Sequence, residues 1–413
     1  MLKSKKIFAA VLSICISAAS VITPVYAAAG DTFAVSGKTV KVGDYFQMGT
    51  YYGKPILWRC VDYDENGALI LSDKIICLKA FDASGDNMNG SHGRGKPNTL
   101  FSSKVYYREF YGSCYWGDSN IRDWLNSEAS AGSVVWSCGN PPDSEHCLNN
   151  ANPYDQEAGF LINFTSAERS AIKTVTQKLL LEGDEYSETF GPDYHIYNSY
   201  IADIMQNYDT AYSETATDRM FLIGIKQLYA VYTNLGGYYK AYPTAEAVNN
   251  STLIDSDDLA PDKIWNYWLR DPNGKPEWDN SSSPRYVSFK PSVAGGVNFA
   301  DSADIGTYGV RPAFYLNTAS AKITSGSGSE NDPYVINGSA FTYGDADGDG
   351  KVTANDATLV LQKTLTGGIV LPLQNKSDEW LKYVDVDKDT HITASDASYI
   401  LQKALKENYK LPL

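Results

Sequence analysis

The chain has 413 residues, 43% of them hydrophobic, and a formal net charge of −14 at pH 7. This length allows two or three domains with cores of their own, and the hydrophobic content excludes global disorder. Such an acidic chain shows no basic face for phosphates, which argues against nucleic acid as a partner. The 30 tyrosines and 8 tryptophans suit core packing and also stacking on sugar rings, so they favour a carbohydrate-facing protein.

The first residues have the layout of a secretory signal peptide. Three lysines precede an apolar run, and small residues surround Ala27. We expect residues 1–27 to be a signal peptide that is removed on secretion. The alternatives are a membrane anchor, for which the run 7–22 is short, and lipid attachment at Cys15. No other segment is long enough to cross a membrane, so no transmembrane segment is expected in the mature chain.

The histidines and cysteines give no clear metal or disulfide pattern. The four histidines are scattered without metal-ligand spacing. Secretion permits disulfides, and Cys138 with Cys147 could close a short loop, but the cysteines beyond the leader are odd in number. Their pairing therefore stays open. These cysteines are Cys60, Cys77, Cys114, Cys138 and Cys147.

The segment 31–338 reads as one large domain that begins with antiparallel strands. Two short apolar runs, 55–63 and 67–76, are rich in β-branched residues and predict strands. The turn DENG between them predicts a hairpin. Four helical segments are expected next, the first capped by Asp118 or Ser119 and the second opening with a capping box. They cover 118–129, 165–177, 218–233 and 262–272.

The end of this domain is expected to return to strands. The segment GVRPAFYLN predicts one strand, and GSGSENDPYVI predicts a turn that leads into a closing strand. Residues 339–343 then form a short linker. The segments that start at Gly43, Ser119, Trp265 and Gly309 together resemble a domain of unknown function common in secreted and surface proteins of Gram-positive bacteria. The pairing of WLR with GVRP is also similar to the C-type-lectin and formylglycine-generating-enzyme fold group.

Two stretches near the end of the chain carry aspartates at alternate positions and close on a fourth: GDADGDGKVTAND and VDVDKDTHITASD. Calcium takes about six to eight oxygen ligands, which a tight loop can supply from alternate positions and from its twelfth residue. A lone acidic turn is usually only solvated, but two copies in one register predict two calcium ions, in loops 345–356 and 385–396. The predicted ligands are Asp345, Asp347, Asp349, Lys351, Thr353 and Asp356, then Asp385, Asp387, Asp389, His391, Thr393 and Asp396.

Each loop leads into a predicted helix. The segments NDATLVLQKTL and SDASYILQKAL align without a gap and place apolar residues at helical spacing. No helix is predicted before the first loop, so each unit is loop then helix, unlike an ordinary EF-hand, and SDEWLKYV predicts a connecting helix. The apolar residues are Ala357, Val360, Leu361 and Leu365, then Ala397, Ile400, Leu401 and Leu405.

This duplicated unit, 344–411, resembles the type I dockerin module of cellulosomes. The resemblance implies a small all-α, calcium-binding module that docks onto a cohesin domain of a scaffoldin or cell-surface protein. Because the two halves carry nearly the same side chains, it also implies binding in two orientations related by a half turn. It places the partner contacts at Ala354, Asn355, Leu361, Gln362, Ala394, Ser395, Leu401 and Gln402.

One residue departs from the pattern of the first loop. Gly350 permits the left-handed turn at loop position 6, whereas Thr390 occupies that place in the second loop. A β-branched residue is strained there by about 1–2 kcal/mol. The second loop is therefore expected to bind calcium more weakly than the first.

The expected fold class is α+β, with a large mixed domain followed by the dockerin. The dockerin implies a secreted protein attached to a cellulosome on a Gram-positive surface, with a part in polysaccharide binding or degradation. For the large domain we favour a carbohydrate- or surface-binding module, in which Trp268 or Trp278 contacts a glycan. A glycosidase with an unidentified carboxylate pair is the alternative, with Asp271 and Glu277 as candidates, and a structural spacer is a third. No catalytic motif decides whether it is an enzyme.

Overall fold

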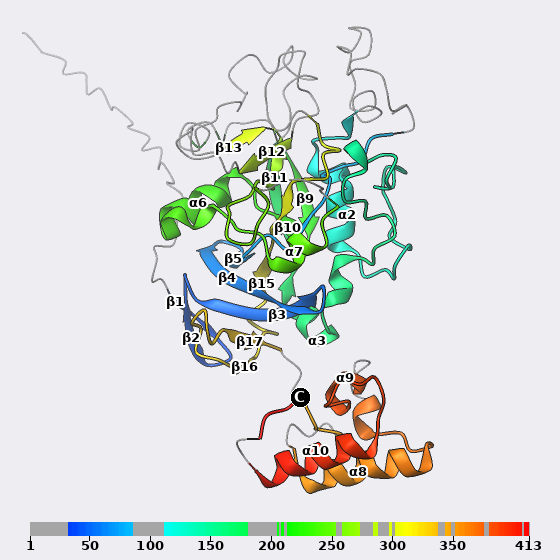
Figure 1. The fold of residues 1–413 in the computed structure, drawn as a ribbon. Helices are drawn as coiled ribbons and strands as arrows, with labels where there is room; N and C mark the ends of the chain where they lie inside the picture. The colour runs from blue at the N-terminus through cyan, green and yellow to red at the C-terminus, as the bar shows by residue number, and fades with distance from the viewer. Residues whose placement is uncertain are drawn as a thin grey trace, which may run out of the picture.

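The structure is a computed structural model with mixed helix and sheet (Figure 1). Residues 1–27, the expected signal peptide, and 339–342, in the expected linker, lie outside the residues it describes. The described residues are 32–85, 111–180, 205, 208–209, 213–252, 258–272, 284–287, 297–299, 302–337, 343–347, 352–375, 380–406 and 409–412.

Among the described residues, eight strands form the sheet at the centre of the large region. Asp64 of β4 pairs with Gly67 of β5 in antiparallel register, which confirms the predicted DENG hairpin. The closing strand β17 runs parallel to β3, so the end of the domain returns to its beginning. In spatial order the strands are β10 (Phe221–Leu222), β15 (Pro312–Leu316), β5 (Gly67–Ser72), β4 (Lys54–Asp64), β3 (Tyr45–Tyr51), β17 (Tyr334–Ile336) and β16 (Ile323–Ser325), and β7 (Ile172–Lys173) also pairs with β15.

A second sheet, with five strands among the described residues, contains the WLR segment. The helix predicted over 262–272 is wrong, because Tyr267–Pro272 is a strand, β11, whose six residues are all buried. A strand buried on both faces is apolar without alternation, so its pattern resembles that of a buried helix. The order is β13 (Val297–Phe299), β12 (Pro284–Val287), β11, β14 (Gly309–Val310) and β6 (Cys77–Leu78). Two-stranded sheets pair β1 (Thr32–Val35) with β2 (Lys38–Lys41), and β8 (Val175–Leu180) with β9 (Ser213–Asp218).

Two of the four helices predicted in the large region begin where the sequence places them. Helix α2 begins after Ser119, and α3 begins after Thr165, which forms a complete capping box with Glu168. Helix α3 nevertheless ends after five residues, because the β-branched residues that follow pair in β7 and β8. The helices are α2 (Asn120–Asn126), α3 (Ser166–Ser170), α6 (Ile225–Leu235), α7 (Ala245–Asn249), α8 (Ala354–Thr366), α9 (Trp380–Val384) and α10 (Ala394–Leu405), with 3-10 turns η1 (Trp116–Asp118), η2 (Leu148–Asn150), η3 (Phe160–Asn163), η5 (Gly236–Tyr239) and η6 (Pro372–Asn375). Helix α6 begins seven residues later than the predicted 218–233, because Asp218 ends β9 and Phe221–Leu222 form β10.

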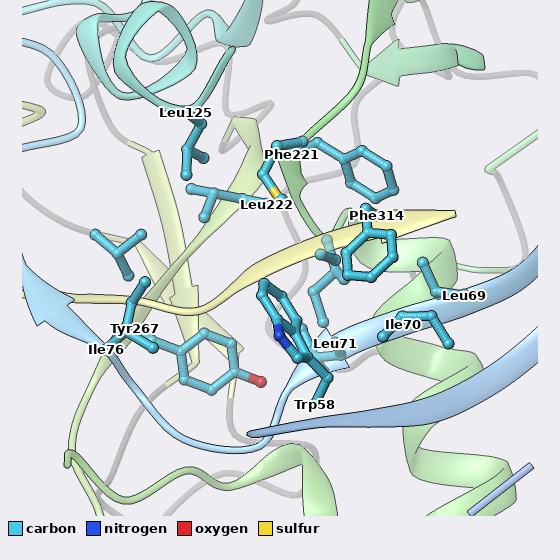
Figure 2. Close-up of a cluster of buried hydrophobic side chains, with 14 of the residues drawn as sticks. Trp58, Leu69, Ile70, Leu71, Ile76, Leu125, Phe221, Leu222, Tyr267 and Phe314 are labelled. Carbon is cyan, nitrogen blue, oxygen red and sulfur yellow. The ribbon is translucent and has the colours of Figure 1, made fainter. Parts of the chain in front are cut away.

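The core of the large region collects side chains from both sheets and from α2 (Figure 2). Trp58 of β4 meets Phe314 of β15 edge-on, with ring centroids 5.0 Å apart and planes at 81°. The Trp58 indole nitrogen donates a hydrogen bond to the Met48 carbonyl at 2.8 Å, so this buried ring leaves no donor unpaired. Phe221 and Tyr267 approach the same cluster from β10 and β11. One hydrophobic core therefore joins the two sheets.

The residues after 343 form a separate hydrophobic cluster, in which α8 packs against α10. The predicted helices are confirmed here, including the connecting helix α9. Only the first half of each predicted apolar stripe is buried, as in Val360 and Ile400, whereas Leu365 and Leu405 are 76% and 74% exposed. None of the described helices is long and apolar enough to cross a membrane.

Candidate functional site

Two clusters of three carboxylates occur among the described residues. In each cluster the carboxylate oxygens lie within 4.8 Å of one another, the first and last aspartates are buried, and the middle one is partly exposed. The clusters bring together loop positions 1, 3 and 12 of both predicted calcium loops. They are Asp345, Asp347 and Asp356, and Asp385, Asp387 and Asp396.

The aspartate at position 12 of the first loop ties the loop to its helix. The Oδ1 atom of Asp356 accepts hydrogen bonds from the backbone nitrogens of Ala346 and Asp347, at 2.8 and 3.1 Å. Its Oδ2 atom accepts from the backbone nitrogen and the hydroxyl of Thr353, at 2.8 and 2.9 Å, within the capping box of α8. One carboxylate therefore holds the two ends of the loop together.

The second loop repeats this arrangement. Asp396 accepts on Oδ1 from the backbone nitrogen of Val386 at 2.8 Å and on Oδ2 from that of Thr393 at 2.9 Å. Asp385, at position 1, accepts from the backbone nitrogen of Thr390 at 2.9 Å. The two loops thus share hydrogen bonds at position 12 as well as their sequence pattern.

Position 6 of the second loop has the strained backbone that its sequence predicts. Thr390 has φ 73°, in the left-handed region that favours glycine, and Lys388 two residues earlier has φ 62°. The neighbouring His391 is largely exposed at its side chain, and its backbone nitrogen donates to Asp389 Oδ1 at 2.8 Å. The exposed side of this loop is therefore held by its own backbone hydrogen bonds.

Two of the remaining predicted ligands are helix caps. Thr353 and Thr393, at position 9, are the N-caps of α8 and α10, and both side chains accept a backbone hydrogen bond within the cap. Asp349 and Lys351 lie outside the described residues.

The charges in these clusters favour a bound cation. Burial raises the pKa of Asp387, and the carboxylates of the same loop raise it further, while a hydrogen bond from the backbone nitrogen of Asp389 lowers it. Like charges a few ångströms apart repel one another, and a divalent cation removes that repulsion. Since hard cations such as calcium prefer oxygen ligands, the carboxylates of both clusters fit the predicted ion.

The predicted partner residues lie on the outside of the helix pair. Seven of the eight are exposed, and Gln402 is partly exposed. Leu361 and Leu401 are 41% and 40% exposed, at the same position in the two repeats. Asn355 also donates to Asp347 Oδ2 at 2.9 Å, so this face adjoins the first carboxylate cluster. The duplicated helices therefore present two similar exposed faces.

Asp271, one of the two carboxylates suggested for glycoside cleavage, is buried in the fold. Asp271 is fully buried, and its Oδ2 accepts a hydrogen bond from the backbone nitrogen of Ile225 at 2.6 Å. It therefore stabilises the start of α6 rather than facing a substrate. The tryptophan suggested for glycan contact is likewise buried, since Trp268 is 0% exposed and donates to the Lys79 carbonyl. Glu277 and Trp278 lie outside the described residues.

The arginine of GVRP stabilises the core through hydrogen bonds to the backbone. The Arg311 side chain is fully buried and donates to the backbone carbonyls of Ser72, Tyr238 and Asp73, at 2.9, 3.2 and 3.3 Å. Its guanidinium lies 4.6 Å from the Tyr238 ring centroid, and that of Arg59 lies at the same distance from this ring. The arginine of this motif therefore has a structural role.

No disulfide joins the five described cysteines, so the loop closure considered for Cys138 and Cys147 is not found. Four of the five are buried, and Cys138 is exposed. Burial raises the pKa of Cys77 to about 12, so this thiol is not an activated nucleophile.

Comparison with protein families agrees with the two parts of the structure. A family model described as Domain of unknown function (DUF6273) matches residues 65–318, more than half of the chain. A model described as Dockerin type I domain matches residues 343–405, which confirms the resemblance seen in the repeats. Neither the curated proteins nor the solved structures gave a match. The chain belongs to the DUF6273 family and carries a type I dockerin domain, a calcium-binding module that implies docking onto a cohesin of a cellulosome.

Proposed function

We propose that the protein is a secreted component of a cellulosome on a Gram-positive surface, anchored there by its dockerin. The observation that carries this proposal is the duplicated carboxylate cluster, in which positions 1, 3 and 12 of both loops converge ahead of similar helices. Each loop holds one calcium ion, through the aspartates of the cluster and the further ligands predicted from its sequence. Residues 1–27 are the signal peptide, 31–338 the large domain and 344–411 the dockerin.

Docking uses the outer faces of α8 and α10. Because Leu361 and Leu401 are exposed to the same extent at matching positions, either helix can present the same contact to a cohesin. Ion binding orders the loops from which these helices start, since position 12 belongs to both the loop and the capping box. Calcium and partner binding are therefore coupled.

We propose further that the large domain binds carbohydrate or a surface partner. Its aromatic content and the faint likeness to the C-type-lectin group support this role, and Asp271, one carboxylate suggested for catalysis, serves the fold. A glycosidase with an unidentified carboxylate pair is the alternative. Release of reducing sugar from polysaccharide by the purified protein would favour that alternative.

The docking proposal is tested by capture of the full-length protein on immobilised type I cohesins. Capture is expected with calcium and not with chelator. Leu361→Asp and Leu401→Asp alone are each expected to retain capture, because the other face remains, whereas the double variant loses it. Capture that persists in chelator, or in the double variant, would contradict this use of the two helices.

A further inference from the structure

A pocket of about 210 Å³ opens on the surface of the large region. It is lined by the tip of the β3–β4 hairpin, by residues between β5 and β6, and by the first turn of α7, elements that are labelled in Figure 1 apart from β6. Backbone contacts fix this meeting, because Thr244 donates to the Ile75 carbonyl at 2.9 Å and Ile75 also forms a bridge with Pro243. The pocket is thus built on paired backbone from three separate parts of the chain.

One of the residues that line the pocket, Tyr52, has an unfavourable backbone conformation. Tyr51 pairs with Lys54, so Tyr52 and Gly53 form a two-residue turn, with φ 47° and 71°. Such turns favour asparagine before glycine, because both residues need positive φ. Tyr52 is 38% exposed, so burial in the core does not account for a tyrosine here. Strain of this kind, held at a pocket, points to a functional role for the side chain.

The neighbouring Tyr51 provides a rigid support for this ring. The two tyrosine rings lie 4.3 Å apart between centroids. Tyr51 also packs edge-on against Trp124 and Phe160, at 6.0 and 5.7 Å, and its hydroxyl donates to Glu157 Oε2 at 3.1 Å. Because contacts on several sides fix the Tyr51 ring, the Tyr52 ring packs against a rigid neighbour. A preorganised aromatic face of this kind costs little to order on binding.

The charges around the pocket balance. Lys54 and Lys74 line it together with Asp73 and Glu246, two groups of each sign. This mixture offers donors and acceptors to a ligand rich in hydroxyl groups, while the net charge of −14 disfavours a polyanion. Pockets for drug-sized ligands measure about 300–1,000 Å³, so this smaller one suits a single ring.

A second pocket, of about 410 Å³ beside α2, is less suited to a ligand. Its arginines already have partners, since Arg122 pairs with Asp218 at 2.7 Å and Arg219 with Glu128 at 2.6 Å.

We propose that the Tyr52 pocket binds one pyranose ring of a neutral polysaccharide, with the tyrosine ring stacked on the sugar. This assignment rests on the proposed carbohydrate-binding role of the large domain and gives that role a site. The polar groups of Asp73, Lys74 and Glu246 face the hydroxyl groups of the ring, and the rest of the polymer continues over the exposed hairpin tip.

The matched test variant is Tyr52→Asn in the full-length protein. Asparagine is favoured in this turn, so the variant is expected to melt at the same temperature as the wild type or higher, while the aromatic face is lost. Calorimetric titration with cellohexaose and xylohexaose is expected to show binding by the wild type to at least one of them, weakened at least about tenfold in Tyr52→Asn. Tyr52→Phe keeps the ring and is expected to bind as the wild type does. Tyr232→Ala removes an exposed tyrosine of α6 outside the pocket and serves as the control.

The outcomes separate this site from the proposed function. Equal binding by wild type and Tyr52→Asn overturns the pocket assignment but leaves carbohydrate binding standing. Binding of none of the three oligosaccharides, oligogalacturonate included, by the wild type overturns both, whereas docking is read separately by cohesin capture. A preference for oligogalacturonate over both neutral sugars overturns the assignment to a neutral polymer.

Discussion

Replacing Thr390 by glycine tests whether the second calcium loop holds backbone strain. Thr390 has φ 73°, a conformation that costs a residue with a Cβ atom about 1–2 kcal/mol and costs glycine almost nothing. Glycine in turn loses about 0.5–1 kcal/mol more in backbone entropy when the loop becomes ordered. The difference leaves a net gain of about 0–1.5 kcal/mol, and its midpoint of about 0.75 kcal/mol corresponds to calcium binding tighter by about threefold.

The assay is calorimetric titration of calcium into full-length protein that also carries Asp345→Ala, so that the second loop is observed alone. Thr390→Ala is the control, because alanine keeps the Cβ atom that causes the strain. Its affinity is expected to stay near that of the Thr390 protein. If Thr390→Gly binds calcium no more tightly than Thr390→Ala, the strain argument and the predicted weakness of the second loop are refuted.

Two further predictions concern the large domain. Arg311→Lys replaces a planar group with one that cannot reach all three carbonyls or stack on Tyr238, so the free energy of unfolding in denaturant should fall by about 3 kcal/mol; an unchanged value would contradict the structural role of GVRP. Burial raises the pKa of Asp64 above its usual 3.8, although hydrogen bonds from Tyr315 and Asn66 lower it. A group whose pKa is raised by folding contributes stability at low pH and loses that contribution as pH rises through its folded pKa. Asp64→Asn cannot ionise and therefore does not lose this contribution as the pH rises. The melting temperature of the variant minus that of the wild type should therefore increase from about pH 4 to pH 7. A difference that does not change with pH would argue against a raised pKa.

Local signals in the sequence predicted much of this structure. The DENG turn, the capping box at Thr165 and the starts of α8 and α10 each depend on a few neighbouring residues, and the structure contains all of them. The same holds for Thr390, because loop position 6 requires positive φ whatever the surrounding fold. These features need no knowledge of distant partners.

Features that depend on distant residues were missed. The residues of Tyr267–Pro272 are all buried, Arg270 and Asp271 included, so the segment shows no alternation and its sequence alone does not distinguish it from a helix. The burial of Asp271 depends in the same way on α6, which starts 46 residues earlier. The Tyr52 pocket requires three segments to meet. A signal was present even there, since tyrosine before glycine in a two-residue turn departs from the usual asparagine.

The most direct test of the account is the number of calcium ions that the chelator-treated, full-length protein takes up in calorimetric titration. Two ions per chain are predicted, with a gain in helical circular dichroism, and one ion is predicted after either Asp345→Ala or Asp385→Ala. No uptake, or an uptake that neither substitution changes, would contradict the assignment of the paired carboxylate loops as calcium sites.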